Sequence, residues 1–408
     1  MSLPTPESTA ARGGPAWLVA ARQDAANWLA TSPAPSSSAE VWRYSPIDDL
    51  DLGVFLPGAT GTQARTLGGL EGIGVRIDAA ALLAGASDVD GVSVSSLSAH
   101  PEGAVLLGSA APADEFVAAL SLASIDDGIV IDVPRARLSS TPIVIVHNLA
   151  GGVQARRTIV RAAPGSSVTV IEAWVGGGDT TLSAPVTELL VDDGAHVAHA
   201  SIQLLDDASW HLGTVKARVG RDGVVTQLTA GLGAAYDRCR TDVTLAGQGA
   251  SSVLRSTYLG TADQIHDLRT HQIHEAPRTT SDLLCKGAVT GDSRSIYTGL
   301  ITMRHGASRA DANQTNHNLV LSDGAHADSV PNLDIAENDV RCSHASTVGP
   351  LDEDQRFYLE ARGIEPVDAE RLLVRGFFTD LLERSSIIGA RGVVGEVLDE
   401  RLEGAGLR

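Results

Sequence analysis

The chain has 408 residues, of which 43% are hydrophobic, so it can bury a sizeable core and long disordered regions are not expected. Aromatic residues make up only 4% and the formal net charge is −19. This combination argues against a sugar-binding groove, a nucleic-acid interface and an anionic membrane surface. The 42 glycines favour a β architecture with many tight turns.

The N-terminal segment is predicted to begin with a helix. Pro15 can occupy the first helical position, and the Pro- and Ser-rich run 32–38 predicts the end of the helix and a linker. Residues 39 to about 130 mix short strands with Ala-rich stretches, and the pattern of residues 46–135 does not define individual elements. We assign residues 1–135 to an N-terminal helical and mixed region. The apolar face of the predicted helix consists of Trp17, Leu18, Ala21, Ala25, Trp28 and Leu29.

From about residue 140 the chain repeats one unit, an alternating apolar strand followed by a turn that ends in glycine. Turn glycines at 165, 194, 223 and 249 are 29, 29 and 26 residues apart, and 57 residues separate Gly249 from Gly306. A turn without glycine is expected at 278–281, and the period breaks at the turn 322–325. A period in the high twenties predicts a solenoid, and a parallel β-helix fits it better than a β-sandwich. We assign residues 136–350 to this β-helix core.

Residues 351–408 are predicted to form a helical domain. Asp352 can cap a helix that ends at Gly363, and Pro366 can open a second helix. A third helix is expected from about 393 to 402. The predicted fold is therefore mainly β, a parallel β-helix between N-terminal and C-terminal helical segments. The apolar face of the second helix consists of Ala369, Leu372, Leu373, Phe377, Leu381 and Leu382.

The three cysteines, Cys239, Cys285 and Cys342, form no disulfide framework and predict a reducing compartment. The N-terminus shows no basic leader followed by an apolar run, and no window approaches the roughly 18 apolar residues of a membrane span. We therefore expect a cytoplasmic protein without membrane or nucleic-acid partners. The chain has no G-x-x-x-x-G-K-[ST] phosphate loop, so any ATP hydrolysis would come from a partner.

Several segments carry a family resemblance. They are Ile335–Gly349 around Cys342-Ser343-His344, Asn316–Ser322, Phe357–Ile364, Lys286-Gly287, Tyr297–Ile301 and, more briefly, Glu40–Ser45. Together they resemble the SufB/SufD family of iron–sulfur cluster assembly scaffold subunits, most like the SufD branch. Asn316 stands where SufB-like chains place a cysteine, and His344 stands where they place a glutamate. Both departures favour the SufD branch.

The resemblance implies a right-handed parallel β-helix and a non-catalytic scaffold role in a SUF-type complex. It also implies two partners, a SufB-like sister subunit and a SufC-like ABC-type ATPase, with iron acquisition and cluster assembly at the subunit interface. Iron or a cluster would be held transiently and shared with the sister subunit, and no cofactor would be bound permanently. We also expect that the isolated chain can form a homodimer through its β-helix.

Cys342 and His344 are the candidate iron- or cluster-binding residues. Residues i and i+2 of a strand point to one face, so the thiol and the imidazole can reach the same spot. Both groups are ligands for iron, but three scattered cysteines cannot surround a conventional four-thiolate cluster, so a partner would have to supply ligands. We expect both residues near a subunit boundary at one end of the solenoid. The alternative is that both are structural residues.

Other polar residues have ordinary explanations in the predicted fold. Cys239 and Cys285 lie in apolar strand contexts and are expected in the core. The histidines at 266, 271 and 274 are spaced by five and three residues, which does not suit one face of a strand. The acidic pairs at 192–193 and 206–207 are expected in turns rather than as acid–base pairs.

The second C-terminal helix is the expected dock for the ATPase, through Leu372, Phe377, Phe378 and Leu381. Adjacent Phe377 and Phe378 point to different sides of a helix, so Phe378 is the predicted anchor. The alternative is that these rings only cover the end of the solenoid.

Two other functions are compatible with a β-helix. One is a polysaccharide-active enzyme, which would carry an aromatic-lined groove and a secretion signal; the few aromatics and the missing leader count against it. The other is a purely structural solenoid without a cluster role.

Overall fold

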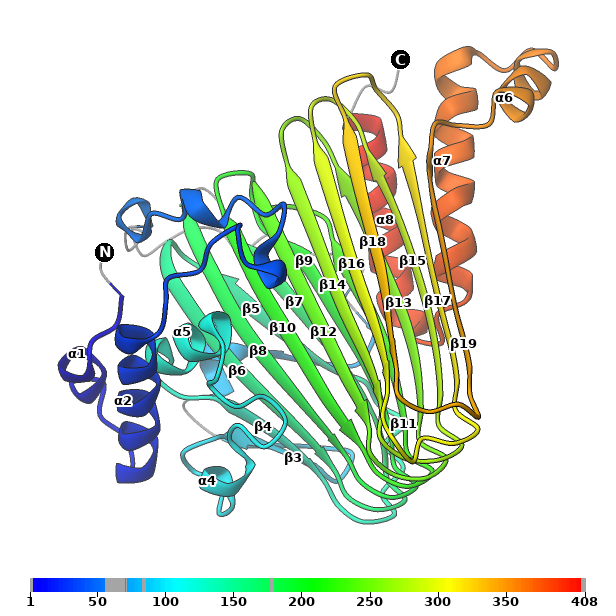
Figure 1. Ribbon diagram of the computed structural model, residues 1–408. Helices are drawn as coiled ribbons and strands as arrows, with labels where there is room; N and C mark the ends of the chain where they lie inside the picture. The colour runs from blue at the N-terminus through cyan, green and yellow to red at the C-terminus, as the bar shows by residue number, and fades with distance from the viewer. Residues whose placement is uncertain (1–2, 56–69, 71, 83–85, 177–179, 405–408) are drawn as a thin grey trace.

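The structure is a computed structural model that describes residues 3–55, 70, 72–82, 86–176 and 180–404. Two large, mostly parallel sheets face each other across a shared interior (Figure 1). From β5 onward the chain alternates between the two sheets, so each strand pairs with the second strand along the chain. The molecule is therefore a parallel β-solenoid flanked by N- and C-terminal helices, as predicted.

One sheet has nine strands and the other has ten. In spatial order the first contains β1 (Val75–Asp78), β5 (Ile143–Leu149), β7 (Ser167–Gly176), β9 (His196–Leu204), β11 (Val224–Gly231), β13 (Ser251–Gly260), β15 (Thr280–Val289), β17 (Asp311–Val320) and β19 (Arg341–Gly349). The second contains β18 (His326–Ile335), β16 (Arg294–Met303), β14 (Ile265–His274), β12 (Tyr236–Leu245), β10 (Trp210–Val219), β8 (Thr181–Val191), β6 (Gly152–Ala162), β4 (Ile129–Val133), β3 (Val92–Ser96) and β2 (Ser87–Val89).

A column of tight turns forms one corner of the solenoid. Each turn has a residue with positive φ whose N–H donates to a carbonyl of the next coil, as from Gly165 to Asp193 (3.0 Å) and from Arg278 to Ser308 (2.9 Å). Arg278 confirms the predicted turn without glycine. The positive-φ residues of the column are Ala136, Gly165, Gly194, Asp222, Gly249, Arg278 and Arg309.

The column corrects two details of the predicted repeat. Asp222, not Gly223, takes the left-handed conformation, and Arg309 rather than Gly306 holds the column position of its coil. The turn at 322–325 belongs to the opposite corner, where the Ser322 hydroxyl donates to the Gly291 carbonyl (2.7 Å). The predicted break in the period is therefore wrong, because β17, β18 and β19 continue the pairing in register.

The N-terminal segment covers the outer face of the ten-stranded sheet. Helix α5 packs on β6, β8 and β10, and α2 packs on α5. The apolar face predicted for the first long helix is part of this core. Strands β1 and β4 lie N-terminal to residue 136 and already pair in parallel with the solenoid sheets. The helical elements of this segment are α1 (Pro6–Ala10), α2 (Ala16–Thr31), α3 (Ala79–Leu82), α4 (Gly103–Leu106), α5 (Phe116–Ser124) and the 3₁₀ turns Glu40–Trp42, Ile47–Asp49 and Leu52–Val54.

The C-terminal helices are α6 (Glu353–Glu360), α7 (Pro366–Glu383) and α8 (Ile388–Gly404). The Asp352 carboxylate caps α6 by accepting from the backbone N–H of Asp354 (2.9 Å), and Pro366 opens α7, as predicted. Helix α8 begins at Ile388, five residues before the predicted start. None of the helices in the described ranges is long and apolar enough to cross a membrane.

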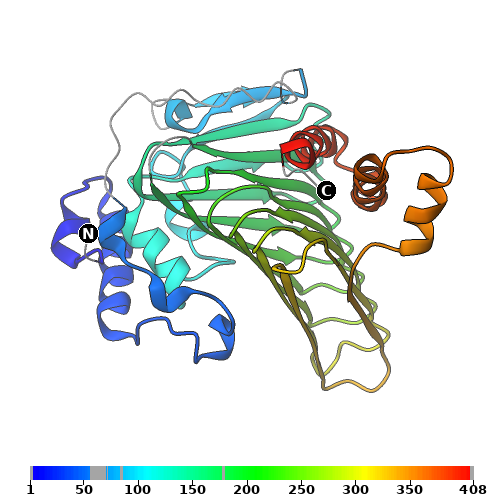
Figure 2. The same ribbon diagram turned by 90° about the horizontal axis from the view of Figure 1, so that it is seen from above.

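Helices α7 and α8 lie along the outer face of the nine-stranded sheet (Figure 2). The alternative expectation that they cover the end of the solenoid is therefore wrong. That end remains open, since no described strand pairs with the outer edges of β18 and β19. Helix α6 projects away from the sheets beyond the start of α7 (Figure 1).

Candidate functional site

Cys342 and His344 both lie on β19, the edge strand at the open end of the solenoid. They pair in register with Ala312 and Gln314 of β17, whose side chains are buried in the interior. Cys342 and His344 therefore share the face of β19 that continues the interior, as the i and i+2 spacing predicted. Cys342 is half-buried and His344 is exposed. Their position at one end of the solenoid is confirmed, whereas their proximity to another subunit stays a prediction.

Unpartnered amide groups lie in the layer directly below this strand. Both polar atoms of the Gln314 side chain are buried without a hydrogen-bond partner. Gly299 makes room for this side chain, because a Cβ at that position would lie 2.2 Å from Gln314 Nε2. Asn316 Oδ1 accepts from Ser329 Oγ (2.9 Å), but its Nδ2 is also unpartnered. Buried polar groups are normally satisfied, so this layer is suited to a ligand or a polar partner surface.

The electrostatics of Cys342 favour the neutral thiol. Burial and the nearby Asp311 carboxylate raise the pKa of Cys342 above its ordinary value. A thiolate is the form that binds iron. The positive charge of the iron itself, or of a cationic residue of a partner, would therefore have to offset the raised pKa of Cys342.

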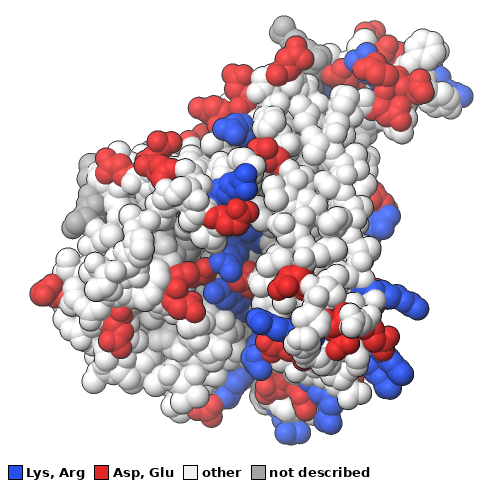
Figure 3. All heavy atoms as spheres, in the orientation of Figure 1, with Lys and Arg blue, Asp and Glu red and all other residues white. Residues whose placement is uncertain are grey.

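The open end also carries apolar side chains that the interior would otherwise bury. Leu333 and Ile335 of β18 and Val348 of β19 are 39%, 47% and 44% exposed. Unpaired strand edges beside apolar side chains are a ready surface for association with another chain. The outer surface over β14, β16 and β18 is largely free of charged residues (Figure 3).

Phe378 does not have the role predicted for it. Its side chain is 2% exposed and packs with Leu381, which is fully buried, in the core between the C-terminal helices and the nine-stranded sheet. The helical stripe that faces the sheet is rotated relative to the predicted one, so Phe378 is inside while Leu372 is 46% exposed. Phe377 is half-buried, and its ring and its carbonyl both contact the Lys286 ammonium.

Exposed aromatic residues on this domain lie on α6 instead. Phe357 and Tyr358 are 70% and 56% exposed, and the Arg362 guanidinium lies 4.6 Å from the Tyr358 ring centroid. Exposed rings beside an arginine are typical of the centre of a protein interface.

The other residues singled out from the sequence take mostly ordinary places. Cys285 is in the apolar core, where burial raises its pKa to about 12. His266 and His274 point inward from opposite ends of β14 while His271 is half-buried on the outer face and bonds to Thr302 (2.9 Å), so they form no cluster. The acidic pairs at 192–193 and 206–207 lie at turns, as expected.

A polar group in the solenoid interior was not expected from the sequence. Glu172 is fully buried and accepts hydrogen bonds from Nε2 of both His147 and His199 (2.9 Å each). Burial alone would raise its pKa, but the bonds from the two histidines outweigh it and hold the pKa of Glu172 below its usual range. The His147 ring stacks on Trp174, with centroids 3.8 Å apart. Polar residues at alternate strand positions were visible in the sequence, but the pairing that places β5, β7 and β9 side by side was not.

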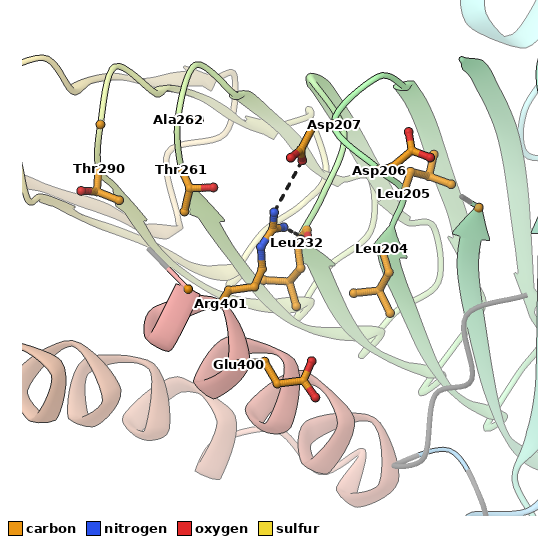
Figure 4. Close-up of a pocket in the computed structure, with 13 residues that line it drawn as sticks. Leu204, Leu205, Asp206, Asp207, Leu232, Thr261, Ala262, Thr290, Glu400 and Arg401 are labelled. Carbon is orange, nitrogen blue, oxygen red and sulfur yellow. Dashed lines mark hydrogen bonds and ion pairs between the residues drawn. The ribbon is translucent and has the colours of Figure 1, made fainter. Parts of the chain in front are cut away.

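A pocket of about 860 Å³ lies between α8 and the turns after β9, β11 and β13 (Figure 4). Arg401 reaches into it from α8, pairs with Asp207 (3.7 Å) and donates to the Leu232 carbonyl. These contacts tie α8 to the solenoid. Asp206 and Asp207 line this pocket, whereas the candidate iron-binding residues Cys342 and His344 do not.

Comparison with known proteins agrees with this architecture. Residues 145–377 match the family described as SUF system FeS cluster assembly, SufBD core domain. An iron-sulfur cluster assembly SufBD family protein of Mycobacterium tuberculosis is 35% identical over 247 residues, which cover 59% of this chain and 61% of the relative. The chain thus spans about three fifths of the length of that mycobacterial protein.

Two relatives named iron-sulfur cluster assembly protein SufD align more widely. The Escherichia coli protein is 27% identical over 389 residues, which cover 91% of this chain and 90% of the relative. The Bacillus subtilis protein is 28% identical over 292 residues, with coverages of 70% and 66%. The family match covers more than half of the chain and coincides with the solenoid and the start of α7. This chain belongs to the SufBD family of iron–sulfur cluster assembly proteins.

Proposed function

We propose that the chain is a non-catalytic scaffold subunit that pairs with a SufB-like sister subunit through the open end of its solenoid. In this proposal iron or a nascent cluster is cargo, held transiently between the two subunits with Cys342 and His344 as this chain's contribution. The observation that carries the proposal is that both side chains extend the interior face of the last strand, beside uncovered apolar residues and unpartnered amides. Family membership supports this proposal over a polysaccharide-active enzyme or a purely structural solenoid.

The proposed pairing with a SufB-like subunit is tested by a substitution at the open edge of the solenoid. Val348→Asp places a charge on an apolar side chain that is 44% exposed, and should abolish co-purification with a SufB-like subunit. Val105→Asp is the matched control, because Val105 is 75% exposed on α4. In isolation the same edge should pair with a second copy, so sedimentation should show a homodimer that Val348→Asp dissociates. Unchanged pairing by a folded Val348→Asp protein would refute the interface.

The cargo role is tested separately in the assembled complex. Anaerobic reconstitution with Fe²⁺ and sulfide should yield less cluster per complex for His344→Ala and for Cys342→Ser. The control is His326→Ala, which removes another exposed imidazole, from the preceding strand β18 of the other sheet. If all three variants assemble clusters like the unmodified complex, Cys342 and His344 are not ligands.

We also propose that a SufC-like ATPase binds the C-terminal helical domain through Phe357, Tyr358 and Leu372, in place of Phe378. These three side chains are the large apolar ones that α6 and α7 leave exposed in the described structure. A pull-down with Phe357→Asp should lose the ATPase, whereas Val105→Asp should keep it. Retention of the ATPase by Phe357→Asp would exclude this surface.

A further inference from the structure

Three potential metal ligands meet inside the solenoid, away from its open end. They are His211 of β10 and Asp237 and Cys239 of β12, and one ligand atom from each lies within 4.8 Å of the other two. His211 and Asp237 are partners in the parallel register, and Cys239 follows Asp237 on the same inward face. The strand pairing therefore places all three groups in one spot, and all three are buried.

Two glycines keep this spot clear of other side chains. A Cβ at Gly213, the register partner of Cys239, would lie 2.6 Å from His211 Nε2. A Cβ at Gly231 would lie 2.0 Å from Asp237 Oδ2. Any other residue at either position would displace the imidazole or the carboxylate.

The space beside the cluster suits a single small occupant. His211 and Cys239 line a small cavity of about 10 Å³. That is the room needed for about one water molecule. A tetrahedral metal with bonds of about 2.0–2.3 Å holds its ligands about 3.3–3.8 Å apart, so a small closure of the cluster brings it to coordination distance.

In the described interior no lysine or arginine pairs with the buried Asp237 carboxylate. Its hydrogen-bond partners there are His266 Nδ1 and Cys239 Sγ, at 3.3 Å each. The neighbouring cations of β12 face outward, where Arg238 lies over the Trp42 ring and Arg240 pairs with Asp242. A buried charge needs compensation, which a bound cation would provide.

The histidines are already oriented for such a role. His211 Nδ1 bonds to Ser183 Oγ (3.1 Å), which leaves Nε2 directed at the cavity side. His266 contacts the carboxylate through Nδ1, and its Nε2 is buried without a hydrogen-bond partner. An imidazole that is fixed through its second nitrogen is the usual arrangement of a metal-ligating histidine.

We propose that His211 Nε2, the Asp237 carboxylate and the Cys239 thiolate form a buried site for one divalent transition metal of the Fe²⁺ or Zn²⁺ class. One water in the cavity completes the shell, and His266 holds the carboxylate from outside it. Imidazole and thiolate ligands select such metals over Ca²⁺ or Mg²⁺. Binding releases the Cys239 thiol proton. The site is independent of the proposed cargo site at Cys342 and His344.

The test uses Co²⁺ alone as the probe, with the full-length chain under anaerobic conditions. Because the ligands are buried, Co²⁺ is supplied both to the folded protein and during refolding from urea. By either route about one Co²⁺ per chain should survive desalting and show a thiolate-to-Co²⁺ charge-transfer band. Cys239→Ser should abolish the band and weaken binding at least about 100-fold.

Matched variants separate this site from the other cysteines. Cys285→Ser removes another buried inward-facing thiol, and Cys342→Ser removes the one at the open end; both should keep the band. Should Cys239→Ser fail to fold, Asp237→Asn provides the second test, and it should lose the Co²⁺-induced rise in Tm. No retained Co²⁺ by either route, or a band that persists without Cys239 or disappears only without Cys342, would overturn the site.

Discussion

Phe378→Ala is expected to release the C-terminal helices from the solenoid. The ring is 2% exposed and packs in the core that α7 and α8 share with the outer face of the nine-stranded sheet. Truncating a buried phenylalanine removes its transfer free energy and leaves a cavity, at a cost of about 3–5 kcal/mol. This cost should lower the free energy of the local opening of α7 and α8 rather than that of the whole chain, since these helices contact the solenoid only from outside the nine-stranded sheet.

Hydrogen exchange followed by mass spectrometry measures this opening directly. A loss of 3–5 kcal/mol corresponds to a fall in amide protection of roughly two to three and a half powers of ten in α7 and α8. Protection in β9 to β13 should change far less. The control is Phe357→Ala, because that ring is 70% exposed and its removal should change stability by no more than about 0.5 kcal/mol. A fall below tenfold in Phe378→Ala, or an equal fall in both variants, would refute the packing argument.

Three further predictions concern the solenoid itself. Arg157 Nη2 lies 2.8 Å from Glu188 Oε1 in a fully buried ion pair. Arg157→Met should lower the free energy of unfolding by about 3–5 kcal/mol in urea titrations, because it leaves the buried Glu188 carboxylate without its cation. A loss under about 1 kcal/mol would contradict this. Burial lowers the pKa of His274 from 6.5 to about 4. As the pH falls, this imidazole is therefore protonated in the unfolded chain before it is protonated in the folded chain. Stability should therefore fall as the pH drops from about 6.5 to about 4, by up to about 1.4 kcal/mol per pH unit, and His274→Gln should show a shallower pH dependence. Arg278→Gly should stabilise the chain by about 0.5 kcal/mol, because glycine relieves a positive φ of 58°; a lower urea midpoint would contradict it.

Much of the architecture could be predicted because its signals are local. The turn repeat requires a residue of positive φ once per coil, and glycines at 165, 194 and 249 reveal the period. The starts of α6 and α7 follow from Asp352 and Pro366, whose effects act within one helical turn. The shared face of Cys342 and His344 follows from the pleat of a single strand.

The interior cluster could not be predicted, because its members come from different coils. His211 and Asp237 meet only if β10 and β12 pair in the observed register, and a shift of one residue would turn one side chain outward. The repeat varies in length from coil to coil, so the spacing of glycines does not set the register to one residue. Asp222, one position before the glycine that marks this turn in the sequence, shows the same uncertainty.

The sequence by itself determined the solenoid period, the flanking helices and the strand that carries Cys342 and His344, because these depend on contacts between near neighbours. Only the tertiary structure decided which side of α7 is buried. The helix has large apolar residues around much of its circumference, and the nine-stranded sheet selects Phe378 while leaving Leu372 exposed. The sheet also determines that α7 and α8 lie along its side, which leaves the last strands open. These outcomes depend on the shape of a distant surface, which the local pattern of a helix does not contain.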